Sequence, residues 1–290
     1  FGDDGAWRAG IPRELFARAN WFTRDDTLKW FLKDNAPLIG GFANDRPAQK
    51  PTDLMGVAVF PLHENLYKVA STTTRDAGSA QWKPEYCPPQ QAFDKLSFRT
   101  DFGEQDQYML VDGIGEMSHG HRDGASILRF TDNGRLFLTE GHYIETTPRQ
   151  HNMVLVSRDG QQWSPPPLAS LEHRADLPHT GLAQVLTSAY NGADWRRNIL
   201  WVKERFFVVF DEVQAREAGD YDLECLWRSL GRVSLSPTRF TVDQAGQDFS
   251  IEGTDGAACV VREQWEGQGS NYYASYPYSN DGLVKVLRQH

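Results

Sequence analysis

Residues 125–140 read ASILRFTDNGRLFLTE, and this stretch decides the fold. Two short runs rich in apolar residues, 125–130 and 136–139, flank the turn sequence Asp132-Asn133-Gly134. Asn-Gly suits a two-residue hairpin turn, because both central residues of that turn adopt positive φ. The stretch therefore predicts two antiparallel strands joined by a tight turn.

The same pattern, short runs of Val, Ile, Phe, Tyr and Leu between turn residues, continues through most of the chain after Asp53. These runs predict further strands at 57–60, 67–71, 108–111, 153–156, 182–190, 198–203, 206–210, 221–227, 240–242 and 259–264. Glu204-Arg205 predicts a second tight connection. Short strands in this number, without helices between them, predict a mainly β fold, a large antiparallel β-sandwich.

The first residues of the chain differ from the rest. Residues 12–22 predict a helix entered through Pro12, and Thr23 is the expected N-cap of a second helix over 24–35. Two short helices with aromatic faces cannot bury those faces alone, so they should pack on the following domain or belong to a larger helical array. We expect a helical segment at 1–45 and a β-sandwich domain at 46–290.

Composition narrows the class of protein. The chain has 290 residues, 40% of them hydrophobic and 24% charged, as in ordinary globular proteins. Its net charge of −9 argues against a nucleic-acid partner, and no apolar run is long enough to cross a membrane. No signal peptide is visible, and a chain beginning at Phe1 is expected to be a mature or excised piece. Cys225 and Cys259 could form a disulfide, with three buried thiols as the alternative.

Histidines gather around the predicted hairpin. The stretch SHGHRD at 118–123 carries His119 and His121, which point to the same face if the segment is extended. Glu140 ends the second strand of the hairpin, and His151 begins another strand. Imidazoles and a carboxylate from neighbouring strands suit a divalent metal, with zinc the first expectation. The alternative is a set of half-exposed histidines that bond to the backbone at strand ends.

A resemblance to a known family rests on these motifs. The passage 113–156, with HGHRD, NGRLFLTEGHY and HN, resembles the heparinase II/III-like family of polysaccharide lyases. DWRR at 194–197, KERFFVVFD at 203–211 and SYPY at 275–278 fit the same pattern, so the resemblance runs from about residue 93 to the C-terminus. Gly2-Asp3-Asp4 with the two predicted helices resembles the end of the α/α toroid that precedes the sandwich in that family.

The resemblance implies roles for individual residues. His119 would line the cleft and take part in catalysis, while His121, Glu140 and His151 would hold the metal; the family usually has aspartate in place of Glu140. Tyr143 is the best local candidate for a proton donor, although a strand-end aromatic also suits packing. The substrate would be an acidic, uronate-bearing polysaccharide cut by β-elimination. An upstream helical domain of the same protein would complete the site, and the protein would be secreted or periplasmic.

Three further residues are candidates for substrate contact. Trp195 and Arg197 could stack on sugar and pair with its carboxylate, or could pack within the sandwich. Arg122 could contact substrate or form a salt bridge with Asp123. Two other functions stay open: a non-catalytic carbohydrate-binding or structural sandwich with a strand-stapling metal, and a metal-dependent hydrolase with a metal-bound water.

Overall fold

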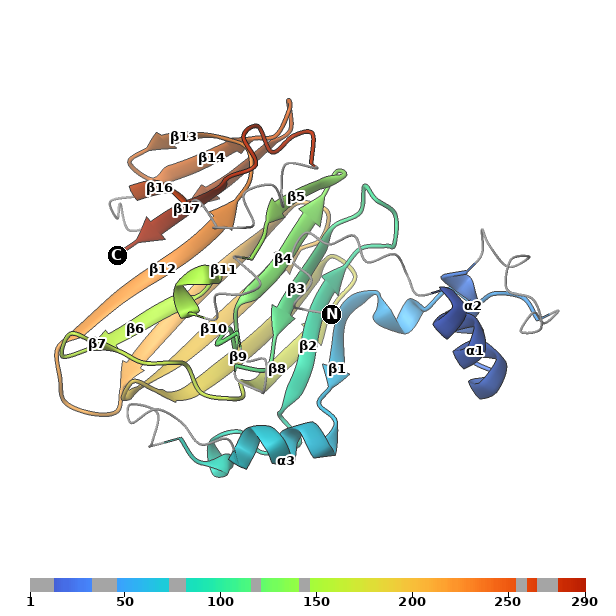
Figure 1. Cartoon of the computed structure of the whole chain (residues 1–290), viewed down its shortest axis with the longest axis horizontal. Helices are drawn as coiled ribbons and strands as arrows, with labels where there is room; N and C mark the ends of the chain where they lie inside the picture. The colour runs from blue at the N-terminus through green and yellow to red at the C-terminus, as the bar shows by residue number, and fades with distance from the viewer. Residues whose placement is uncertain are drawn as a thin grey trace.

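A computed structural model describes residues 13–32, 46–72, 82–115, 121–140, 147–253, 260–264 and 276–290. Within these ranges the strands form four antiparallel sheets, and short helices lie mainly toward the N-terminus (Figure 1). The predicted fold class, a large antiparallel β-sandwich with a short N-terminal helical segment, is confirmed. The division into domains at residue 45 stays a prediction.

The first sheet contains the hairpin that opens the sequence argument. Its strands follow the chain in order: β1 (Gly56–Pro61), β2 (Phe93–Arg99), β3 (Tyr108–Asp112), β4 (Ile127–Asp132) and β5 (Arg135–Leu138). Asn133 and Gly134 have φ of 51° and 69°, the positive values that the turn requires. The predicted hairpin is therefore confirmed.

The second sheet forms the opposing layer behind the first (Figure 1). Its spatial order is β11 (Phe206–Ala215), β10 (Ala193–Val202), β9 (Thr180–Tyr190) and β8 (Ser170–Asp176). Phe98 of β2 meets Trp201 of β10 and Phe207 of β11, with ring centroids 6.0 and 5.6 Å apart. Glu204 has φ 63° in the tight β10–β11 connection, as the sequence predicts.

A third sheet extends the front layer, in the order β16 (Val260–Gln264), β17 (Val284–Gln289), β12 (Tyr221–Ser229), β6 (Val154–Arg158) and β7 (Gln161–Gln162). The backbone N–H of Thr139, just after β5, donates to the carbonyl of Arg228 on β12 at 3.1 Å. A small fourth sheet contains β13 (Arg232–Ser236), β14 (Arg239–Asp243) and β15 (Asp248–Glu252). Its Phe249 stacks on Phe137 of β5, which joins it to the main core.

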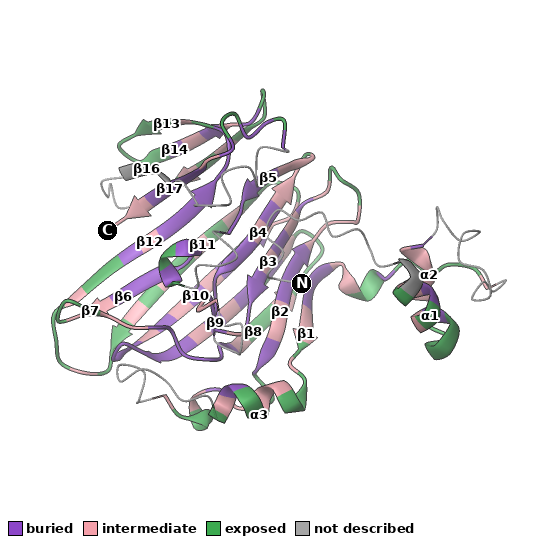
Figure 2. Cartoon of the chain, in the orientation of Figure 1, coloured by how far each residue is buried: buried purple, intermediate pink, exposed green. Residues whose placement is uncertain are grey.

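Burial alternates along several strands, where buried residues, purple in Figure 2, are separated by half-buried or exposed ones. On β10, the odd-numbered residues from Ala193 to Trp201 are all buried, while Leu200 is exposed. This period of two is what a strand with one face on the core produces. The core that results is continuous between the layers and holds the hairpin in place.

The helices correct three details of the sequence analysis. The predicted strand at 67–71 is wrong: it lies in α3 (Glu64–Thr72), where Tyr67 and Ala70 share a face and the Lys68 and Glu64 side chains are 2.6 Å apart. The first helix is α1 (Arg13–Thr23). The second, α2 (Asp26–Trp30), is capped by Asp25 instead of Thr23, and residues 33–35 lie outside the described ranges.

Contacts of the helical segment reach the sandwich as expected, since Trp30 and Phe102, after β2, have ring centroids 5.0 Å apart. The described ranges also contain three short 3-10 turns: η3 (Thr52–Leu54), η5 (Pro84–Tyr86) and η6 (Pro148–Gln150). No helix in the described part of the chain could cross a membrane. Cys225 is a free thiol here, and Cys259 lies outside the described residues.

Candidate functional site

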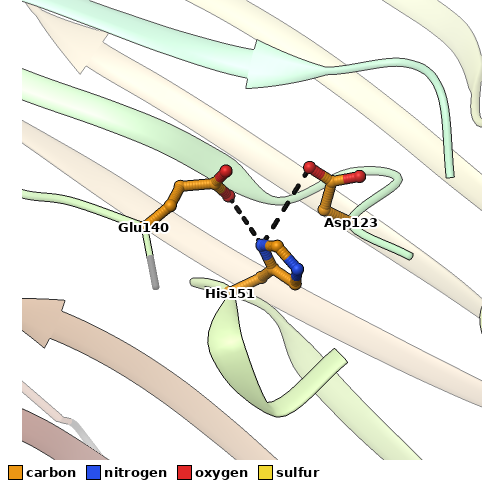
Figure 3. A group of neighbouring side chains, drawn as sticks. All are labelled: Asp123, Glu140 and His151. Atoms are coloured by element: carbon orange, nitrogen blue, oxygen red, sulfur yellow. Dashed lines mark hydrogen bonds and ion pairs between the residues drawn. The ribbon is translucent and has the colours of Figure 1, made fainter. Parts of the chain in front are cut away.

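Asp123, Glu140 and His151 meet in the interior, as Figure 3 shows. His151 Nδ1 lies 2.9 Å from Glu140 Oε1 and 4.0 Å from Asp123 Oδ2. One possible ligand atom from each residue lies within 4.8 Å of the other two. The three residues are between 1% and 8% exposed, so this cluster is almost completely removed from solvent.

Each member of the cluster comes from a segment next to a strand. Asp123 lies in the loop before β4, Glu140 follows β5, and His151 lies between η6 and β6. The β4–β5 hairpin brings the ends of its two strands together, and Ser126 Oγ donates a 3.2 Å hydrogen bond to Glu140 Oε1. The hairpin that determines the fold therefore also assembles two-thirds of the cluster.

Burial sets the protonation of the cluster. Desolvation is the main cause that raises the pKa of Asp123 well above its ordinary value, and the nearby Asp112 raises it further. Desolvation and Asp112 also raise the pKa of Glu140, against the hydrogen bond from Ser126. The pKa of His151 is lowered by desolvation, against the attraction of Asp123. Without a cation, the buried groups therefore favour their neutral forms.

A neighbouring ion pair belongs to the same electrostatic environment. Lys95 Nζ lies 2.8 Å from Asp94 Oδ1 and 3.1 Å from Asp112 Oδ1. These two carboxylates hold the pKa of Lys95 above its ordinary value despite burial. Lys95 is thus paired with two other acids, and the buried Arg228 also lowers the pKa of Glu140. A divalent cation would add to this positive charge and favour ionisation of both Asp123 and Glu140.

A divalent metal fits these residues. The donor set is one imidazole nitrogen and carboxylate oxygens from two residues, a mixture that zinc and similar ions accept. Both carboxylates are buried, and a cation would replace the protons that burial otherwise imposes on them. Asp123, Glu140 and His151 are therefore the described residues best placed to hold a metal.

The pKa shifts predict how the metal-free chain responds to pH. A raised pKa in the folded state makes the carboxylate contribution complete at low pH and lost as the pH rises through the folded value. We expect the free energy of unfolding in chelator to fall as the pH rises above about 4, the ordinary carboxyl pKa. The lowered pKa of His151 has the opposite effect: its contribution to stability is present at neutral pH and is lost as the pH falls below the ordinary histidine pKa. Urea unfolding of Glu140→Gln should show a smaller decrease of the free energy of unfolding with rising pH. Added metal should abolish the decrease in the unsubstituted chain. The same dependence on pH in the variant and in the unsubstituted chain would contradict this prediction.

The structure brings together two of the three predicted metal ligands, Glu140 and His151. His121 is a half-buried neighbour whose ring centroid lies 6.1 Å from that of His151, and Asp123 joins the cluster where His121 was expected. Asp123 lies in the same HGHRD motif, but strand alternation does not place it in the cluster, because Arg122 has φ 61° and residues 121–126 form no strand. His119 lies outside the described residues, and so does Tyr143.

The predicted substrate contacts at Trp195 and Arg197 are wrong, because both side chains are fully buried. Arg197 forms a two-pronged pair with Asp211, through Nε at 2.9 Å and Nη2 at 3.0 Å, and Trp195 Nε1 donates to the same carboxylate. Both residues serve the interior of the sandwich. Arg122 is half-buried with φ 61°, and its contact with substrate stays a prediction.

No protein-family model and no curated protein sequence matches this chain. Two solved structures share its fold: a heparinase III, with a TM-score of 0.63 and 14% identity, and a heparan sulfate lyase from Pedobacter heparinus, with 0.62 and 13%. Each alignment covers 96% of this chain but only 38% and 40% of those proteins. The chain therefore has the fold of the β-sandwich portion of these larger enzymes.

Proposed function

We propose that this chain is the β-sandwich portion of a polysaccharide lyase that cleaves an acidic, uronate-bearing polysaccharide by β-elimination. The observation that carries the proposal is the buried Asp123–Glu140–His151 cluster, within a fold shared with a heparan sulfate lyase. An upstream helical domain would supply the rest of the site. The protein would act outside the cytoplasm, secreted or in the periplasm.

The reaction explains why these residue types belong together. β-Elimination removes the proton next to the uronate carboxylate and expels the 4-oxygen, so it needs a base, a proton donor and a group that neutralises the carboxylate. His119 would act as the base or as a donor to the substrate acid, and Tyr143 would protonate the leaving oxygen. His119 precedes Asp123 by four residues and Tyr143 follows Glu140 by three, so both residues are close in sequence to members of the cluster.

The cluster would hold a divalent ion, zinc in the first instance, on Asp123, Glu140 and His151. When bound, the ion supplies fixed positive charge that keeps both carboxylates ionised and binds three segments together. The described residues then perform a positioning function: they fix the start of β4, the end of β5 and the turn before β6 relative to one another.

The test is an assay for unsaturated uronate ends, with the chain joined to its helical domain and with heparan, chondroitin and alginate as substrates. We expect product from at least one polymer, and a loss of turnover of about 10²- to 10⁴-fold for His119→Ala. Metal content and circular dichroism should not change. The exposed His173 on β8 offers a matched control, since His173→Ala should retain full activity. Absence of product from all three polymers would refute lyase activity.

A second function is favoured by the deep burial of the cluster. Members that are at most 8% exposed suit a metal that only holds strands together, as in a non-catalytic carbohydrate-binding sandwich. Such a protein would bind polymer and contain metal, but would release no unsaturated product. In that case His119→Ala would change affinity for the polymer without any turnover to lose.

A further inference from the structure

Asn152 follows His151 directly and is fully buried. Its carboxamide nitrogen donates to two backbone carbonyls, those of Ile127 and Thr139, both at 2.8 Å. Its carboxamide oxygen accepts the backbone N–H of Arg228 at 2.6 Å. All three side-chain bonds of one residue therefore end on three different strands or strand ends.

These bonds connect the segments that carry the metal cluster. Thr139 is the residue before Glu140, Ile127 begins β4 shortly after Asp123, and Asn152 itself follows His151. A single planar carboxamide thus sets the separation of all three segments. Within the hairpin alone, the β4–β5 ladder fixes only two of them.

The main chain of Asn152 adds a second connection between the same segments. Its carbonyl accepts the backbone N–H of Ile127 at 3.1 Å and Nη1 of Arg197 at 2.9 Å. The same Nη1 donates to the carbonyl of Ala125 at 3.2 Å, two residues after Asp123. Arg197 is held from behind by Asp211, so the connection reaches into the opposite layer of the sandwich.

We infer that Asn152 is the positioning residue of the cluster, which sets the distances between Asp123, Glu140 and His151 through backbone bonds and touches no ligand itself. The inference rests on the metal cluster of the proposed function. It assigns to the asparagine of the HN pair a role distinct from that of the histidine beside it. Partners of this kind are known to govern metal affinity through the orientation of the ligands.

The test compares Asn152→Asp with Asn191→Asp in the complete chain. Asn152→Asp keeps the acceptor for Arg228 but replaces the two donated bonds with a carboxylate that faces two carbonyls. Asn191 is a matched control: it is 3% exposed, and its carboxamide donates to the carbonyls of Val156 and Trp163, both outside residues 123–127, 139–140 and 151–153. Both variants should lose stability, so stability alone does not discriminate between a positioning and a structural role.

Metal affinity and local hydrogen exchange discriminate between these roles. We expect the dissociation constant for Co²⁺, followed by its absorption spectrum, to rise roughly 10- to 100-fold in Asn152→Asp and to stay unchanged in Asn191→Asp. In the metal-free chain, amide exchange should accelerate at residues 123–127, 139–140 and 151–153 only in Asn152→Asp. Equal changes in both variants, or an unchanged Co²⁺ affinity in Asn152→Asp, would overturn the inference.

Failure of the proposed function gives a different pattern. If the unsubstituted chain binds no Co²⁺, the metal part of the proposed function fails, and the exchange comparison alone decides the role of Asn152. If the chain binds Co²⁺ with the predicted difference between variants but the complete enzyme releases no unsaturated uronate, the positioning role stands and lyase activity does not.

Discussion

Elemental analysis of the chain, expressed with zinc in the medium, should find roughly one equivalent of divalent metal, and His151→Ala should contain none. His151 supplies the nitrogen donor among the three described groups, and its Nδ1 faces both carboxylates. Without it, two buried acids remain whose raised pKa values favour protons over a cation. The loss of metal should therefore be complete.

Two further variants show whether the loss is specific. Asp123→Asn keeps the shape of the side chain but removes its charge, and should also empty the site if Asp123 is a ligand. His173→Ala removes an exposed histidine of β8 and should retain the full metal content. Metal retained in Asp123→Asn but lost in a His121→Ala variant would show that the ligand set is the one expected from the sequence.

The alternation of apolar and polar residues determines which strands of this fold could be predicted from the sequence. The Asn-Gly turn between two apolar runs correctly predicts the central hairpin, because turn chemistry and alternation agree there. Strands with few apolar residues are harder to predict: β8, with the sequence SLEHRAD, has few of them and is held mainly by pairing with β9. The strand predicted at 67–71 is wrong because its apolar residues, although typical of a strand, are also spaced for one face of a helix.

Some residues of the candidate site could be predicted from local sequence, and others depend on the tertiary fold. Glu140 and His151 were predictable as members of one cluster, because each lies next to the strands of the hairpin or their neighbour. Asp123 was not predicted as a ligand, because it lies in a loop in which the positive φ of Arg122 breaks the alternation of a strand. Asn152 could not be predicted as a positioning residue, because its bonds to Ile127 and Thr139 depend on long-range assembly of strands.

Arg197 illustrates how a correct pattern can lead to a wrong function. Trp195, Ile199 and Trp201 alternate with it on β10, so the period of two already places its side chain on the buried face. Arginine is seldom fully buried, so contact with sugar was a candidate role beside packing within the sandwich. The Asp211 carboxylate on the paired strand, directly opposite in the register, is what makes burial possible.

Arg197→Met should therefore be among the most destabilising single substitutions in the chain, lowering the free energy of unfolding by roughly 3–5 kcal/mol. Removal of the guanidinium leaves the Asp211 carboxylate without its buried partner and the Ala125 carbonyl without its Arg197 donor. The Asn152 carbonyl keeps only the bond from the backbone N–H of Ile127. Urea unfolding of the metal-free chain measures the loss. Arg196→Met is the matched control, because the neighbouring Arg196 pairs with Glu172 near the surface, where an ion pair contributes at most about 1 kcal/mol.

Arg197→Met should also weaken metal binding at the Asp123–Glu140–His151 cluster. Arg197 Nη1 holds the segments of Asp123 and His151 in place, so added metal should stabilise Arg197→Met less than the unsubstituted chain. A double variant, Arg197→Met with Asp211→Leu, should recover part of the unfolding free energy, because it removes the unpaired charge, but it should not recover metal affinity. Equal losses of stability in Arg196→Met and Arg197→Met would mean that solvent reaches the Arg197–Asp211 pair, and that the opposite layer of the sandwich does not support the cluster.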